Sequence, residues 1–309
     1  MLSCISLSAD DKAIPFKIIP DINYANSGNP RQTLDLYLST KIADSNHSIN
    51  TEKQVLPLVI WVHGGGWQNG SKLSGKKPSR LPRILKTGRY LGASINYRLS
   101  GESIWPAQIH DCKAAVRWLS ANASKYGINK NKIAVWGSSA GGHLASMLGN
   151  TNGVEELEGN TGDFLKSKSD VHAVINFYGP SALLQMDEYP SKIKHNSKNS
   201  PESRLLGEAI VEVPYLARQA SPLHHVKKGG PPFIHFHGKL DALVPYHQSL
   251  TLHKKMRSKR NESCLISVQK GTHNMPENFT FKFVIPFLDY VFYGKGNPIN
   301  DQEIIIDKY

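Results

Sequence analysis

The sequence is poor in cysteine. Only three of its 309 residues are cysteines, Cys4, Cys112 and Cys264, and they form neither a close pair nor a C-x-x-C motif. A disulfide framework is therefore not expected. Cys112 falls on the apolar stripe of an expected helix and Cys264 in an expected strand, so both are predicted to be buried free thiols.

Long apolar runs are also absent. No stretch is long enough to span a bilayer, so a membrane partner is not expected. The first ten residues are too short and too polar for a complete secretory signal. The expected location is cytoplasmic by default, and secreted or periplasmic if a signal has been trimmed. The oligomeric state has no signature in the sequence.

The basic charge lacks the motifs that would connect it to nucleic acid. The net charge is +12 and the sequence pI is about 9.5. Lysines and arginines are scattered, and no helix-turn-helix, zinc-finger or RNA-binding signature accompanies them. The charge is therefore attributed to solubility and substrate steering, with no nucleic-acid partner. The thirteen histidines lack metal-ligand spacing such as H-E-x-x-H, so no metal site is expected.

Strand-like apolar runs alternate with helix-like segments along the chain. This alternation predicts an α/β fold with a mostly parallel central sheet flanked by helices. The expected strands cover residues 14–19, 34–38, 58–62, 92–97, 132–136, 171–178, 232–237 and 264–268. The expected helices cover residues 106–126, 246–258 and 277–292, the last kinked at Pro286.

Two segments interrupt this alternation. Residues 151–170 are polar and rich in glycine, and residues 181–230 carry many Pro, Ser, Lys and His residues. Insertions this long are often lids or binding loops. We expect one domain over residues 1–309, with a small cap formed by the second insertion.

A G-x-S-x-G motif centred on Ser139 follows the apolar run at 132–136 and precedes a helix-like run. A nucleophilic serine needs a sharp strand-to-helix turn, and Gly137 and Gly141 remove the Cβ atoms that would clash there. The motif therefore predicts a nucleophile elbow.

An activated serine also needs a base and an acid, which follow it in the chain order Ser, Asp, His. Asp241 lies in a glycine-bearing turn after the expected strand at 232–237, and His273 lies in the next strand-end loop. We predict that His273 takes the proton of Ser139 and that Asp241 orients His273. His237 is expected in a packing or turn role, and His143 on a face of the helix after the elbow.

The sequence H-G-G-G-W at 63–67 follows another apolar strand. We predict that the amides of Gly65, Gly66 and Ala140 form an oxyanion hole, in which one donor contributes about 2.7–4 kcal/mol. A phosphate loop would carry G-K-[ST] instead. Trp67 has two interpretations, a wall of the acyl pocket or a cover of the core.

These motifs, together with N-Y-R-L at 96–99, resemble those of α/β-hydrolase fold esterases. They are most similar to the BD-FAE group (bifunctional feruloyl and acetyl-xylan esterase-like), which is related to the hormone-sensitive lipase and prolyl-oligopeptidase branches. The resemblance covers roughly residues 30–292. It implies hydrolysis of short-chain, acetyl or feruloyl esters of carbohydrates without a cofactor. A peptidase or amidase of the same fold, and a non-catalytic ligand-binding protein, remain the alternatives.

Overall fold

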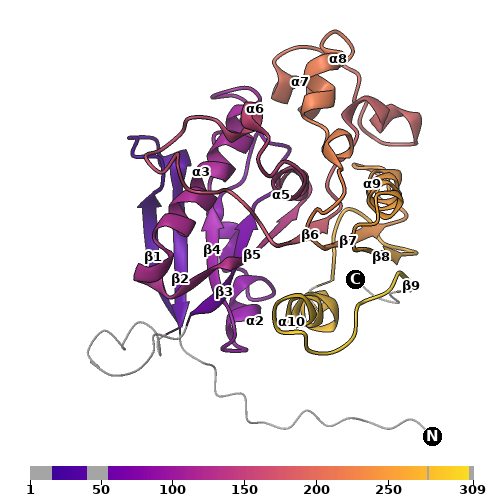
Figure 1. The fold of residues 1–309 in the computed structure, drawn as a ribbon. Coiled ribbons are helices and arrows are strands. Elements are labelled where there is room, and N and C mark those ends of the chain that lie inside the picture. The colour runs from indigo at the N-terminus through magenta and orange to yellow at the C-terminus, as the bar shows by residue number, and fades with distance from the viewer. Residues whose placement is uncertain (1–15, 40–54, 277, 306–309) are drawn as a thin grey trace, which may run out of the picture.

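The computed structural model describes residues 16–39, 55–276 and 278–305. Its centre is a nine-stranded sheet in the order β1-β2-β4-β3-β5-β6-β7-β8-β9 (Figure 1). The β1/β2 and β2/β4 pairs are antiparallel, and the other pairs are parallel. The strands are β1 (Phe16–Asn23), β2 (Thr33–Ser39), β3 (Leu56–Val62), β4 (Leu91–Ile95), β5 (Ile128–Ser138), β6 (Ala173–Phe177), β7 (Phe233–Gly238), β8 (Ser263–Val268) and β9 (Gln302–Ile304).

Helices cover both faces of this sheet, which explains why its central strands are continuous apolar runs. The helices are α2 (Leu81–Leu85), α3 (Ala107–Ala121), α4 (Ala123–Tyr126), α5 (Ala140–Asn150), α6 (Glu155–Glu158), α7 (Pro201–Leu206), α8 (Pro214–Gln219), α9 (His247–Ser258) and α10 (Ile285–Tyr293). Side chains of α3, α5 and α9 belong to one core cluster, and those of α2 and α10 to the other. The predicted α/β architecture is confirmed.

Several boundaries differ from the sequence prediction. The helix expected at 106–126 breaks at Asn122 into α3 and α4, and it ends at Gly127 with φ 68°. The helix expected at 277–292 is not uniform around Pro286, and the kink predicted there stays a prediction. A π-helical turn at Thr280–Val284 leads into α10, and Pro286 occupies the first turn of α10. The chain is therefore helical on both sides of this proline.

The cysteine prediction holds where it can be compared. Cys112 and Cys264 are buried free thiols, whereas Cys4 and the start of the strand expected at 14–19 lie outside the described residues. Among the helices in the described ranges, none combines the length and the apolar character needed to cross a bilayer.

Residues 181–230 connect β6 to β7. They form two 3₁₀ turns, η4 (Leu183–Glu188) and η5 (Pro222–His225), with α7 and α8 between them. In Figure 1, α7 and α8 lie at the top of the view, beyond α5 and α9. The segment leaves the sheet from the carboxyl end of β6. The loops after the parallel strands β3, β5, β7 and β8 leave from the same edge, where ligand sites form in such sheets.

Candidate active site

Ser139 occupies the sharp turn between β5 and α5. Its backbone has φ 55° and ψ −124°, a conformation that non-glycine residues rarely adopt. A Cβ on Gly137 would lie 2.1 Å from the carbonyl oxygen of Gly141, and one on Gly141 would lie 2.1 Å from that of Val62. Only glycine fits at either position. The structure therefore places Ser139 at the strand-turn-helix junction that the motif predicts.

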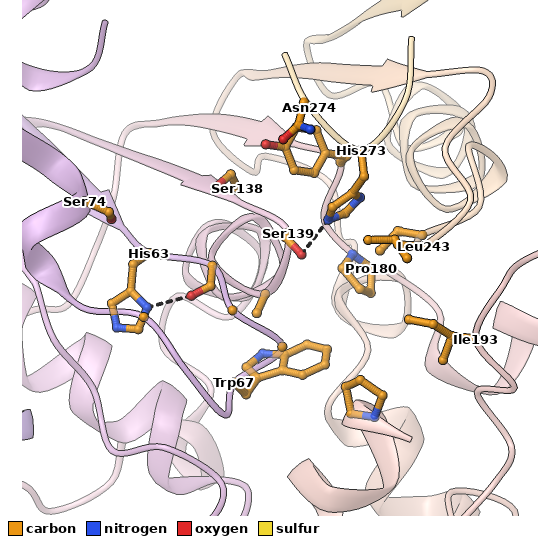
Figure 2. A pocket seen from close by; sticks show the side chains of 18 of the residues that line it. His63, Trp67, Ser74, Ser138, Ser139, Pro180, Ile193, Leu243, His273 and Asn274 are labelled. Atoms are coloured by element: carbon orange, nitrogen blue, oxygen red, sulfur yellow. Dashed lines mark hydrogen bonds between the residues drawn. The ribbon is translucent and has the colours of Figure 1, made fainter. Parts of the chain in front are cut away.

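The three residues of the predicted triad lie in hydrogen-bonding distance. His273 donates Nδ1–H to Asp241 Oδ2 at 2.7 Å. Its Nε2 is then free to accept from Ser139 Oγ, which lies 2.9 Å away. Figure 2 shows the His273 ring pointing at Ser139 across the end of the sheet. Three separate loops, after β5, β7 and β8, thus form one continuous path for a proton.

The carboxylate of Asp241 is fully buried and well supplied with donors. Its Oδ1 accepts the amides of Leu243 at 2.9 Å and Val244 at 3.0 Å. Its Oδ2 also lies 3.3 Å from Nε2 of His237. Burial alone would raise the pKa of Asp241, but hydrogen bonds from His237 and His273 outweigh it and hold that pKa well below its usual range. Asp241 is therefore ionised when it orients His273.

The contact between His237 and Asp241 was not predicted from the sequence. His237 lies on β7, where its Nδ1 contacts Ser249 Oγ at 2.8 Å and its Nε2 contacts the carbonyl oxygen of Val244 at 2.9 Å. These bonds fit the expected packing role. Because the turn after β7 folds back on the strand, that role also brings His237 beside the acid.

The glycine loop after β3 lines the same space. Gly65 has φ 114° and Gly66 has φ 58°, and both line the cavity with Ser139 and Ala140. Within the described ranges, the amides of Gly65, Gly66 and Ala140 have no protein acceptor. Amides without a protein acceptor, on residues that line the cavity beside Ser139, are candidate donors to an oxyanion.

Two histidines, His63 and His143, stabilise this loop through ring contacts and hydrogen bonds. The His63 ring stacks on Tyr97 with centroids 4.2 Å apart, and Tyr97 Oη donates to the His63 carbonyl oxygen at 2.9 Å. Trp67 donates Nε1–H to Nδ1 of His143 at 3.2 Å, and His143 donates Nε2–H to the carbonyl oxygen of Ala220 at 2.6 Å. The sequence prediction gave His143 no such connecting role.

Burial determines the charge of the His143 ring, and it bears on the two interpretations of Trp67. Burial lowers the pKa of His143 to about 4, so the ring is neutral near pH 7 and can accept from Trp67. The Trp67 side chain is only 1% exposed, yet it lines the cavity. Trp67 therefore covers the core and also lines the cavity beside Ser139, and its contact with an acyl group stays a prediction.

A cavity of about 440 Å³ lies beside Ser139. Figure 2 shows Trp67, Pro180, Ile193 and Leu243 around it. Its apolar wall is formed by Trp67, Pro180, Ile193, Pro201, Leu243 and Val244. The charged residues in its wall are Lys77, Arg80 and Glu202. No group of three or more His, Cys, Asp or Glu residues in the described part of the chain is arranged to hold a metal ion.

Several curated proteins similar to this chain are named esterases. Esterase LipC of Mycobacterium tuberculosis is 31% identical over 203 residues, which cover 65% of this chain and 48% of LipC. Esterase LipQ of the same organism is 29% identical over 240 residues, which cover 77% of this chain and 52% of LipQ. The chain spans about half the length of these relatives.

Solved structures extend the similarity to nearly the whole chain. A truncated form of a carbohydrate esterase from gut microbiota superimposes with a TM-score of 0.80 at 29% identity, covering 91% of this chain and 97% of that one. A bifunctional GH43-CE protein of Bacteroides eggerthii gives 0.77 at 33% identity, covering 89% of this chain and 38% of that one. The family model described as BD-FAE matches residues 46–256, which is more than half of the sequence. The chain therefore has the α/β-hydrolase fold and belongs to the BD-FAE family.

Proposed function

We propose that this chain is a serine carboxylesterase that works through an acyl-enzyme on Ser139. The observation that carries the proposal is the hydrogen-bonded series from Ser139 through His273 to Asp241, with contacts of 2.9 and 2.7 Å. A serine hydroxyl becomes nucleophilic when a base takes its proton and a third group holds that base in one tautomer. Ser139 and His273 line the cavity, and Asp241 contacts His273.

The proposed reaction has two halves. Ser139 Oγ attacks the ester carbonyl while His273 takes its proton, and the amides of Gly65, Gly66 and Ala140 stabilise the oxyanion. His273 then protonates the leaving alcohol. In the second half, water gives a proton to His273 and attacks the acyl-enzyme, and the acid leaves as Ser139 regains its proton. No step in this sequence requires a cofactor.

We propose that the substrates are short-chain, acetyl or feruloyl esters of carbohydrates. The similarity to a structure named as a carbohydrate esterase supports the carbohydrate part. A cavity of about 440 Å³ with an apolar wall supports a small acyl group, because small-molecule sites are mainly apolar with a few placed polar groups. In this proposal the chain is one domain, and residues 181–230 act as its cap.

Replacement of Ser139 by alanine tests the proposal. We expect Ser139→Ala to lower kcat on p-nitrophenyl acetate by about 10⁴-fold or more, because the nucleophile is lost. Circular dichroism should show an unchanged fold. A fluorophosphonate probe should label the wild type and not the variant. Substantial hydrolysis by the variant, or an unlabelled wild type, would contradict the assignment.

Paired ester and amide substrates of the same acid test the peptidase alternative. The proposal expects the ester to be hydrolysed with the higher kcat/KM, since the leaving alkoxide needs less help from His273 than an amine does. A higher kcat/KM on the amide would favour the alternative.

A further inference from the structure

A buried carboxylate forms part of the cavity wall. Glu202 lies in the first turn of α7, and its side chain is only 3% exposed. It lines the same cavity as Ser139. Its Oε2 is buried without a hydrogen-bond partner in the described part of the chain. Burying a carboxylate oxygen in this way is unfavourable unless a hydrogen-bond donor reaches it. A donor on a bound ligand would remove that cost.

The neighbouring histidine satisfies this carboxylate only in part. His195 Nδ1 lies 3.0 Å from Glu202 Oε2, but the two atoms are not aligned for a hydrogen bond, and both are buried without one. The other ring nitrogen lies 3.1 Å from Ser191 Oγ, which donates to the carbonyl oxygen of Ala242 at 3.1 Å. A carboxylate has about four lone-pair sites, and one ring nitrogen occupies at most one. Glu202 therefore keeps the capacity to accept further donors.

Two contacts hold Glu202 beside the glycine loop of residues 63–68 (the oxyanion loop, named for its proposed donors Gly65 and Gly66). Its neighbour Pro201 packs against Gly66, since a Cβ on Gly66 would lie 3.5 Å from Pro201 Cβ. Arg204 donates Nη1–H to Gln68 Oε1 at 2.9 Å. The first turn of α7 is thus held against the loop that carries the predicted oxyanion donors. A substrate that reaches Ser139 shares its cavity with Glu202.

We propose that Glu202 accepts a hydrogen bond from a hydroxyl group of the bound ester, and so selects hydroxyl-bearing substrates. This inference rests on the proposed esterase function. The hydroxyl comes from one of two parts of the ester: a free hydroxyl of a sugar in the alcohol, or a phenolic hydroxyl in a feruloyl acyl group. A site built to bond a hydroxyl discriminates strongly against an analogue that lacks it, because the buried acceptor is then left unpaired.

Two matched substrate pairs distinguish these sources. The first pair is a monoacetate of methyl β-xylopyranoside with its other hydroxyls free, and the same ester with those hydroxyls methylated. The second is methyl ferulate and methyl 3,4-dimethoxycinnamate. The kcat/KM of each is measured for the wild type, Glu202→Gln and Glu202→Leu. Glu208→Gln is the control, because Glu208 lies in the same segment, is 45% exposed and pairs with Lys198 away from the cavity.

In one pair, we expect Glu202→Leu to lower kcat/KM of the hydroxyl-bearing ester by about tenfold or more and to leave the methylated ester within about twofold. Glu202→Gln should lie between Glu202→Leu and the wild type, and Glu208→Gln should match the wild type. The affected pair identifies the part of the ester that Glu202 contacts. Equal losses on both members of each pair, or no loss in either pair, would overturn the inference.

The wild type provides a test that does not depend on folding of the variants. It should prefer the hydroxyl-bearing member of one pair by about tenfold. Equal kcat/KM within both pairs would refute the role of Glu202 while leaving the esterase proposal intact. Failure of the wild type to hydrolyse p-nitrophenyl acetate and all four esters would instead contradict the esterase proposal itself.

Discussion

At the scale of single residues, the hydrogen bonds of Asp241 determine which nitrogen of His273 faces Ser139. An asparagine in its place would still fit between the amides of Leu243 and Val244, but it would stabilise the wrong tautomer of His273. We expect Asp241→Asn to lower kcat on p-nitrophenyl acetate by about 10⁴-fold with little change in fold. Steady-state kinetics with circular dichroism would measure this.

A control for this substitution is available on α10. Asp289 binds Arg89 and Tyr90 and does not line the cavity. Asp289→Asn should therefore keep kcat near the wild-type value. A near-normal rate in Asp241→Asn would mean that another acid orients His273.

The sequence could predict the residues whose roles follow from chain order. Ser139, Asp241 and His273 each lie in the turn or loop after a buried strand, and the carboxyl ends of neighbouring parallel strands meet at one edge. Glu202 could not be found in this way. Its place beside Ser139 depends on how a long, aperiodic segment packs on the oxyanion loop, and no local pattern encodes that packing.

At the scale of elements, His143 connects three parts of the molecule. It lies on α5, accepts from Trp67 of the oxyanion loop and donates to Ala220 of the 181–230 segment. We expect His143→Phe to lower kcat by about 10- to 100-fold through misplacement of the oxyanion loop. The free energy of unfolding should fall by about 1–3 kcal/mol, because two buried polar groups lose their partner.

The separate values of kcat and KM distinguish this positioning role from general destabilisation. His143→Gln, whose amide can still donate to the carbonyl of Ala220, should recover part of kcat. If kcat is unchanged in His143→Phe while stability falls, His143 serves only the core.

A second connection between elements anchors the 151–170 segment. Lys113 of α3 is fully buried and donates to Glu158 of α6 at 2.5 Å, and Arg117 donates to the Glu158 carbonyl oxygen at 2.7 Å. Burial lowers the pKa of Lys113, and the Glu158 carboxylate opposes that shift. Removing the carboxylate leaves a buried charge without its counterion.

We therefore expect Glu158→Gln to lower the free energy of unfolding by about 2–4 kcal/mol, a value reduced for the partial exposure of Glu158. Urea denaturation would measure it. The double variant Lys113→Met with Glu158→Gln should regain part of the loss, since the unpaired charge is then gone. Additive losses in the double variant would contradict this account.

Elements with a continuous apolar run were predictable, because burial on both faces of the sheet dictates their composition. β9 was not. It spans only Gln302–Ile304 at the edge of the sheet and is partly exposed, so it has too few residues to show a pattern. The π-helical turn before α10 was missed for a similar reason, because apolar spacing does not distinguish it from an α-helical turn.

At the scale of the whole molecule, buried histidines make stability depend on pH. Burial lowers the pKa of His63 and His143 to about 4 and that of His235 well below its usual range. The unfolded chain, in which histidine has a pKa of about 6.5, binds more protons than the folded protein between these values. Stability is therefore full above about pH 6.5 and is lost as the pH falls from there towards 4.

The expected slope is about 1.4 kcal/mol per pH unit for each such histidine. Urea denaturation at intervals between pH 4.5 and 7.5 would measure this slope. His143→Gln should reduce the slope by the contribution of one histidine. Asp241 should add nothing in this range, since its lowered pKa affects stability only below the unfolded value of about 3.9. A free energy of unfolding that is independent of pH would contradict the prediction.

The 181–230 segment contacts three parts of the site, each through a different residue. Lys192 donates its amide to the Ala242 carbonyl oxygen beside the acid, Arg204 reaches Gln68, and Ala220 accepts from His143. Grafting this segment from a relative to change substrate preference would therefore also replace the residues that contact the turn of Asp241, the oxyanion loop and α5. A chimera that preserves turnover must exchange the residues that this segment contacts together with the segment itself. Substrate specificity and turnover rate therefore have to be changed together in this fold.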